Sequence, residues 1–276
     1  MTQWLRASLH PDDSEFTIHG LDDVRISVAL TGSDLEHLTI DASRAKLRFR
    51  LSEGTPAPER TASSPAVVSR SSGFAHTIRV LADPVRVERI PITLDLQLHN
   101  APIEWQTYAA PEVSTRPESR YALRIADERE GMNGSLVASV KESDLAPLLV
   151  ACLRPALNEA GIRLRRLSVS VVQDGADGVR IEGKTRIRWK VLGASLTGMT
   201  RLVVTPDGVL TVRALQIGSK NPLVDLALRA ARKAIAAEVG RSHDLNEHLG
   251  AEGSHHRLHS VRIAVDERIT LTARLS

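Results

Sequence analysis

Alternating hydrophobic and polar residues run through most of this chain, and a period of two predicts β-strands. The pattern begins at residues 24–30, where Val24, Ile26 and Val28 fall on one face and small or polar residues on the other. The alternation therefore predicts a sheet-rich protein. The other stretches predicted as strands are 46–51, 76–81, 85–98, 103–105, 121–125, 136–140, 167–171, 179–181, 184–191, 199–204, 209–217, 258–265 and 269–275.

Breaks in this alternation predict the loops and turns. Proline-containing stretches at 53–73 and 106–120 predict two loops, of which the first is expected to be mobile. Pro91 interrupts an alternating stretch and predicts an edge position or a break. The sequence TPDG at 205–208 predicts a hairpin turn. Since only two long helices are available as crossovers, we expect the strands to pair antiparallel throughout.

A helix is predicted at residues 144–161, with Asp144 as the N-terminal cap and Gly161 as the terminator. Pro155 should kink this helix because it lacks the amide that would bond Ala151. Its apolar residues lie on most sides of the cylinder, which is typical of a helix buried on most sides. These residues are Leu145, Leu148, Leu149, Val150, Cys152, Leu153 and Leu157.

A second helix is predicted at residues 221–240, capped by Asn221 and ended by Gly240. One side of it is apolar, and the opposite side is charged. The two helices and the many strands together predict an α+β protein in which a curled sheet covers the helix at 144–161. We interpret residues 1–276 as a single elongated domain. The aliphatic interior could pack solid, or it could leave an apolar groove for an acyl chain.

Composition narrows the classes of partner. Aromatic residues make up only 3% of the 276 residues, which argues against base stacking and hence against nucleic acid as a partner. The formal net charge is +3, so any attraction to anions must come from local clusters. Residues 1–20 are charged and lack an apolar core, and no run approaches a membrane span. We therefore expect a cytoplasmic or membrane-peripheral protein, or an envelope protein if a signal was removed.

Basic residues alternate along two predicted strands, and each set should share one face of a sheet. Such a face could contact anionic head groups, or it could be an ordinary solvated face that protects a sheet edge. The two sets are Arg44, Lys46, Arg48 and Arg50, and Lys184, Arg186, Arg188 and Lys190.

A group of histidines near the C-terminus is the one candidate for metal chemistry, although its spacing matches no zinc motif. The interpretation that we favour is a polar loop with surface histidines, and we expect no metal and no cofactor. No nucleophile elbow and no phosphate-binding loop is present in the sequence, so an enzyme is not expected. The histidines are His243, His248, His255, His256 and His259.

The C-terminal stretch HHRLHSVRIAVDERITLTARLS resembles the closing hairpin of the LmeA-like bacterial phospholipid-binding family. The TPDG hairpin with its following NPLV helix is similar to that family, as is VRISVALTGSDLEHLTIDASRAKLRFRL at 24–51. The resemblance implies a tubular lipid-binding (TULIP-like) fold, in which a highly curved antiparallel sheet wraps around a long helix and encloses an apolar tunnel. It also implies a function in lipid binding, with no catalytic residues.

The resulting hypothesis is a non-catalytic protein that binds or transfers a phospholipid-like molecule in an apolar tunnel. Its partners would be a lipid or other long apolar ligand and an anionic membrane surface. A solid-core scaffold protein and a histidine-dependent metal enzyme are the alternatives. The predicted lipid-binding residues are Leu145, Leu148, Leu149, Cys152, Leu153, Leu157, Val224, Leu228, Ala231 and Ile235, and the predicted head-group contacts are Arg186, Arg188 and Lys190.

Overall fold

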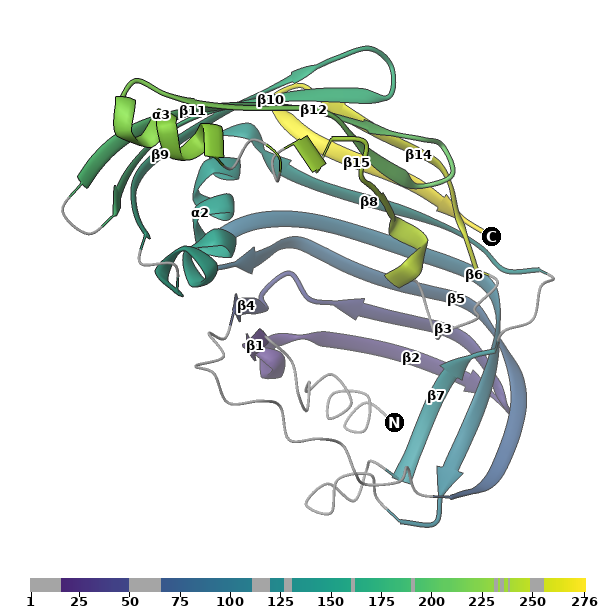
Figure 1. Cartoon of the computed structure of the whole chain (residues 1–276). Helices are drawn as coiled ribbons and strands as arrows, with labels where there is room; N and C mark the ends of the chain where they lie inside the picture. Colours follow the sequence, from purple (N-terminus) through teal and green to yellow (C-terminus); the bar gives the residue numbers. More distant parts are fainter. Residues whose placement is uncertain are drawn as a thin grey trace. The chain divides into compact units, whose positions relative to one another are not determined.

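The computed structural model describes most of the chain (Figure 1). The chain divides into two compact units. The first unit comprises Met1–Val137, Ala251–His256 and Arg274–Ser276, and the second comprises Ala138–Gly250 and Arg257–Ala273. Whether they behave as the predicted single domain stays a prediction. The described residues are 16–49, 66–110, 120–126, 131–159, 162–189, 192–230, 233, 236–237, 239–248 and 256–276.

Most described residues lie in strands, which confirms a sheet-rich α+β protein. The elements that begin in the first unit are β1 (Phe16–His19), η1 (Leu21–Asp23), β2 (Arg25–Thr31), β3 (Asp34–Asp41), β4 (Lys46–Phe49), β5 (Val67–Val87), β6 (Ile90–Tyr108), β7 (Tyr121–Ile125) and β8 (Asn133–Lys141). Those that begin in the second unit are α2 (Glu142–Glu159), β9 (Ile162–Gln173), β10 (Gly178–Trp189), β11 (Leu192–Val204), β12 (Val209–Ser219), α3 (Pro222–Ala230), β13 (Ser242–Asp244), η3 (Leu245–His248), β14 (Leu258–Val265) and β15 (Arg268–Leu275).

The sheet of the first unit is mixed, so the prediction of purely antiparallel pairing is wrong. Its strands follow the order β1-β4-β5-β6-β8, with β3 and β7 also pairing with β5 and β6. Both β3 and β4 pair with β5 in parallel, with Leu38 opposite Ile78 and Lys46 opposite Arg86. Residues 50–66 join β4 to β5, and a connection of this length is sufficient for parallel pairing. All of these residues except Ala66 lie outside the described part of the chain.

The strands β5 and β6 form one long hairpin, which corrects three sequence-based boundaries. Residues 67–73 belong to β5, although the sequence predicts a loop there. They are strand because β6 pairs with them, beginning with Val67 opposite Tyr108. The predicted loop at 106–120 begins only after Tyr108. The predicted strand 85–98 is divided at residues 88–89 into the end of β5 and the start of β6, and Pro91 is the second residue of β6, paired with Arg86. A shift in register between Ala82 and Val85 accommodates Pro84, as bulges commonly do.

The core of the first unit is built from aliphatic side chains with few aromatics. One cluster gathers Leu35, Leu38 and Ile103, and the second gathers Val24, Ala45 and Val85. The indole Nε1 of Trp105 donates a hydrogen bond of 2.8 Å to the carbonyl oxygen of Ser33 at the β2–β3 turn. This core therefore depends on contacts between strands that are distant in sequence.

The second unit contains a five-stranded sheet in the order β13-β12-β11-β10-β9, and every pair in it is antiparallel. The TPDG turn is confirmed, because Thr205 N donates to Val209 O at 2.9 Å and Gly208 has a φ of 84°. The predicted closing hairpin is also confirmed as β14 and β15.

Two contacts fix the start of α2, two residues earlier than predicted. Glu142 Oε1 accepts a hydrogen bond of 3.1 Å from Val171 N, and Glu142 N donates to Glu267 O at 3.3 Å. Asp144 therefore lies in the first turn and is not the cap. The helix continues past Pro155 to Glu159, while the predicted terminator Gly161 lies outside the described residues.

The second helix begins as predicted, because Asp225 N donates to Asn221 O at 2.8 Å. Its described continuous segment ends at Ala230, and Lys233, Ala236 and Ala237 are also helical. Gly240 adopts the left-handed conformation expected of a terminator, with a φ of 87°. Among the described residues, no helix combines the length and the apolar content needed to cross a bilayer.

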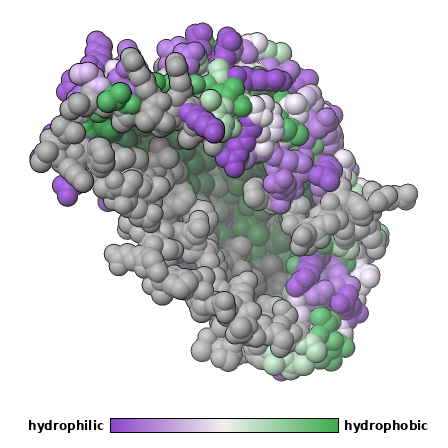
Figure 2. Space-filling model, in the orientation of Figure 1, coloured by the Kyte–Doolittle hydropathy of each residue, from purple (hydrophilic) through white to green (hydrophobic). Residues whose placement is uncertain are grey.

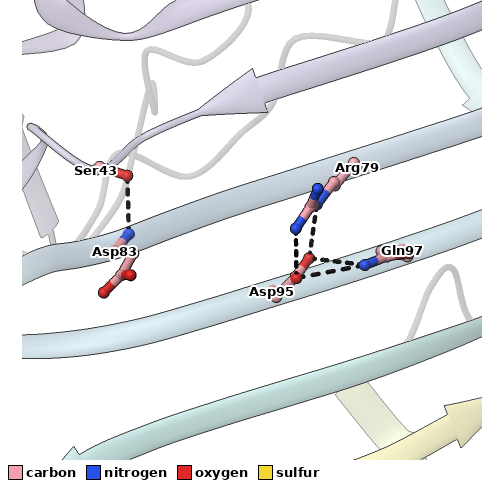
Figure 3. Close-up of polar contacts among 5 residues, drawn as sticks. All are labelled: Ser43, Arg79, Asp83, Asp95 and Gln97. Carbon is pink, nitrogen blue, oxygen red and sulfur yellow. Dashed lines mark hydrogen bonds and ion pairs between the residues drawn. The ribbon is translucent and has the colours of Figure 1, made fainter.

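An ion pair joins the two long strands of the first unit (Figure 3). Arg79 donates to both carboxylate oxygens of Asp95, at 3.1 and 2.8 Å, and Gln97 Nε2 donates to the same carboxylate at 3.3 Å. These hydrogen bonds, with Arg79 as the largest cause, hold the pKa of Asp95 below its usual value, although desolvation opposes them.

We predict that Asp95→Asn lowers the thermal midpoint slightly at neutral pH, because the guanidinium loses its charged partner. A carboxyl with a lowered pKa stabilises the folded state above its unfolded pKa, and this stability is lost as the pH falls through the folded value. The difference in thermal midpoint between Asp95→Asn and the parent protein should thus be constant down to about pH 5 and shrink below about pH 4. Glu36→Gln on the exposed side of β3 is the control, and a pH-independent difference for Asp95→Asn would contradict the assignment.

Candidate functional site

The leucines of α2 are less buried than the sequence pattern predicts. Leu145, Leu148, Leu149 and Val150 are all only half-buried, and no described side chain of this helix is fully buried. The side chains of Cys152, Leu153 and Leu157 lie outside the described set. The described first half of α2 therefore leaves aliphatic surface without complete cover.

The predicted residues of α3 show the same partial burial. Val224 and Leu228 are half-buried, while Leu226 on the same helix is 65% exposed. Ala231 and Ile235 lie outside the described residues. The structure thus places the five predicted lipid-binding residues with described side chains on two helices of one unit, but none of them lines a described hollow.

A hollow of about 520 Å³, here called the strand hollow, lies on the five-stranded sheet of the second unit. Its lining comes from four neighbouring strands, in cross-strand rows set by the register. One row joins Ser168, Lys184 and Thr197, and the next joins Glu182 and Met199. The full lining is Ser168, Val169, Ser170, Glu182, Gly183, Lys184, Thr197, Gly198, Met199, Gln216, Ile217 and Gly218.

A directly paired glycine couple, Gly183 and Gly198, lies at the centre of the strand hollow. A Cβ added at Gly183 would meet only Ser168 O at 3.9 Å, and one at Gly198 only Gln216 O at 3.6 Å. Among the described residues, no side chain lies within 4 Å of a Cβ placed at either position. The row through the glycines continues to Val169 and Ile217, whereas the hydroxyl groups and the two opposite charges of the lining project from the alternate positions.

A second hollow of about 420 Å³, the arginine hollow, continues along β10 and β11. It contains the predicted head-group residues Arg186 and Arg188, together with Arg165, while Lys190 lies outside the described residues. The β9–β10 register shifts beside Arg186 and leaves Arg165 as the extra residue of a bulge. The bulge turns its side chain to the same hollow as the other two, as bulges characteristically re-aim side chains.

The strand hollow and the arginine hollow are neighbours on one sheet, because β10 supplies Glu182 and Lys184 to the first and Arg186 and Arg188 to the second. These four side chains occupy alternate positions of one strand and so share one face. In Figure 2, hydrophilic residues (purple) gather over the strands of this unit, with hydrophobic residues (green) between them. The charged face of β10 therefore carries one carboxylate and one ammonium group at the strand hollow and two guanidinium groups at the arginine hollow.

Sequence reasoning found Arg186 and Arg188 but missed Arg165 and the glycine couple. Alternation along β10 predicts that Arg186 and Arg188 share one face. A bulge shifts the alternation of side chains between the two faces, and the local sequence pattern does not show where this happens. Gly183 and Gly198 become neighbours only through strand pairing. Glycines within two strong strand patterns were the available signal, since a strand glycine often marks a site of close approach.

The histidine hypothesis receives no support from the described part of the chain. His243 lies on β13, His248 in η3 and His259 on β14, and His255 lies outside the described residues. No group of three potential metal ligands occurs among the described residues. Asp244, the nearest carboxylate, instead accepts hydrogen bonds from the backbone N and side chain of Asn246, which lower its pKa.

Comparison of the chain with protein-family models, with curated protein sequences and with solved structures finds no match. The resemblance to the LmeA-like family therefore stays a prediction.

Two strand glycines with different surroundings test the local geometry. At Gly134 a Cβ would lie 2.5 Å from Gln97 O and 2.7 Å from Leu98 Cδ2, so Gly134→Ala should lower the free energy of unfolding by about 1–3 kcal/mol. At Gly198 an added Cβ would meet only Gln216 O at 3.6 Å. Gly198→Ala should therefore raise the free energy of unfolding by about 0.5–1 kcal/mol. Denaturant unfolding of the two variants measures both, and equal destabilisation would show that the sheet face over Gly198 is occupied.

Proposed function

We propose that this protein is a non-catalytic lipid-binding or lipid-transfer protein, whose second unit holds an acyl chain beside α2 and an anionic head group at the arginine hollow. The observation that carries the proposal is the incomplete burial of the leucines of α2. Each large aliphatic side chain contributes about 1.5–3 kcal/mol when fully buried, so a helix rich in them loses stability when they stay wet. A guest with an acyl chain would recover that contribution.

The distribution of burial within the second unit supports this position for the guest. Within β9–β12, the buried apolar residues Val171, Val179 and Val204 lie near the β9–β10 and β11–β12 turns. Toward the other end of the same strands, Leu167, Ile187 and Leu196 are only half-buried. The apolar face of the sheet is thus closed at one end and incompletely covered at the other.

The charge distribution supports an amphiphile with an anionic head. Arg165, Arg186 and Arg188 line one hollow, and arginine forks bind phosphate and carboxylate groups through paired hydrogen bonds. This end of β10 belongs to the half of the sheet whose apolar residues are incompletely covered. By alternation Arg186 and Arg188 lie on the face of β10 opposite to Ile187, so head group and chain would meet at the end of the β10–β11 pair and not on one face.

The finer fold prediction belongs to this proposal. A curved sheet wrapped around α2 and α3, as in tubular lipid-binding proteins, would cover the remaining faces of both helices and enclose the acyl chain. The resemblance of the closing hairpin and of the NPLV helix to the LmeA-like family supports this arrangement. The anionic membrane surface stays the expected second partner, reached through the basic face of β10.

We predict that Leu149→Trp removes most of the bound lipid detected by native mass spectrometry, because the indole fills the space beside α2. Leu226→Trp, at an exposed position of α3, is the matched control and should leave lipid occupancy unchanged. Both variants are first compared with the parent by circular dichroism and thermal melting, so that loss of fold is not read as loss of binding.

The parent protein should carry co-purifying lipid or accept phospholipid from vesicles after delipidation. If it does neither, the proposal is wrong and a solid-core scaffold is the better description. Unchanged occupancy in Leu149→Trp would show that the acyl chain does not lie beside α2.

A further inference from the structure

The first unit contains a cavity of about 680 Å³, here called the basic cavity, that is separate from both hollows described above. Four cationic side chains line it: Arg44, Lys46, Arg86 and Arg89. They come from the β3–β4 connection, β4, the end of β5 and the β5–β6 turn. The remaining lining residues are Asp23, Ser43 and Pro84.

Strand pairing forces two of these cations together. Lys46 of β4 lies directly opposite Arg86 of β5 in the parallel pair, and Arg86 N donates to Ala45 O at 3.1 Å. Like charges at directly opposed positions destabilise a sheet. The fold therefore accepts a local cost here that an anion between the two side chains would remove.

The β5–β6 turn adds the fourth cation from an unusual backbone conformation. Glu88 and Arg89 have φ values of 49° and 76°, in the left-handed region that favours glycine. A two-residue turn of this kind normally carries Asn-Gly or Asp-Gly. Arginine at its second position is costly for the backbone, but it directs a guanidinium to the cavity.

The walls of the basic cavity are fixed by hydrogen bonds and by the core. Ser43 Oγ accepts a hydrogen bond of 2.8 Å from Asp83 N (Figure 3), and Ser43 N donates to Asp41 Oδ1 at 3.0 Å. Ala45, between Arg44 and Lys46, is buried in the cluster of Val24 and Val85. These contacts fix the backbone from which the four cations project, while the cationic side chains themselves are exposed.

The charges of the basic cavity are not balanced within the described residues. Asp23 is its one carboxylate, and no described acidic group forms an ion pair with Arg44, Lys46, Arg86 or Arg89. Of the nearby carboxylates, Asp41 accepts from Ser43 and is also attracted to Arg44, and Asp83 accepts from Thr93 Oγ1 at 3.3 Å. The site consequently suits a ligand with more than one negative charge.

We propose that the basic cavity binds a phosphate-bearing anion, with Arg86 and Arg89 as paired donors and Lys46 and Arg44 as further charges. Guanidinium groups match phosphate geometry with paired hydrogen bonds, and ammonium adds a point charge. The phosphate could belong to a soluble phosphorylated compound or to a lipid head group. The inference does not depend on the acyl site, which lies in the other unit.

Inorganic pyrophosphate is the probe, titrated into the full chain by calorimetry at low salt. Arg86→Ala/Arg89→Ala should weaken its affinity at least about tenfold, because both guanidinium groups donate charged hydrogen bonds to phosphate oxygens. The matched control is Arg213→Ala/Arg262→Ala, which removes the same charge from exposed positions of the other unit. Arg86→Lys/Arg89→Lys should keep part of the affinity and separates lost charge from lost fold.

No pyrophosphate binding by the parent chain, or an equal loss in both alanine pairs, would overturn the proposal. Co-sedimentation with phosphatidylcholine vesicles, with and without phosphatidic acid, identifies the source of the phosphate. Binding that requires phosphatidic acid and Arg86/Arg89 supports a head group, and pyrophosphate binding without vesicle binding supports a soluble ligand. Leu149→Trp should not change pyrophosphate affinity, so failure of the acyl site is distinguishable from failure of this one.

Discussion

Backbone pairing between strands is the interaction on which both units depend. The hairpin of β5 and β6 supplies the frame of the first unit, and the four long strands β9–β12 supply that of the second. Pairing in register puts residues that are far apart in sequence on one face, and a shift of one residue would move every side chain to the other face. The register therefore places the arginine hollow, the glycine couple and the basic cavity.

The same constraint produces the polar and apolar contrasts of the second unit. One face of β10 carries alternating charges, and the other carries Ile181 and Ile187, which stay half-buried. None of the described side chains of α2 and α3 is fully buried. The proposed amphiphile would use both faces of the sheet, with its acyl chain on the aliphatic face and its head group at the cationic one.

In the first unit, parallel pairing sets Lys46 against Arg86 and so concentrates positive charge in one place. The chain has a formal net charge of only +3, so this concentration is a local feature and not a consequence of overall composition. The Arg79–Asp95 pair shows the contrast, because there a guanidinium on β5 has a carboxylate partner on β6. The paired charges of Arg79 and Asp95 link the two strands of the hairpin, whereas the cations of the basic cavity outnumber its one carboxylate.

The sequence by itself determined the features that depend on neighbours in the chain. Alternation located β2, β14 and β15, and TPDG located its turn, since periodicity and turn chemistry are local. Residues 67–73 have no alternation and became strand only because β6 pairs with them. The parallel pairing, the bulge at Arg165 and the approach of Arg86 to Lys46 were decided by the tertiary structure alone, because each depends on contacts between residues that the local pattern cannot relate.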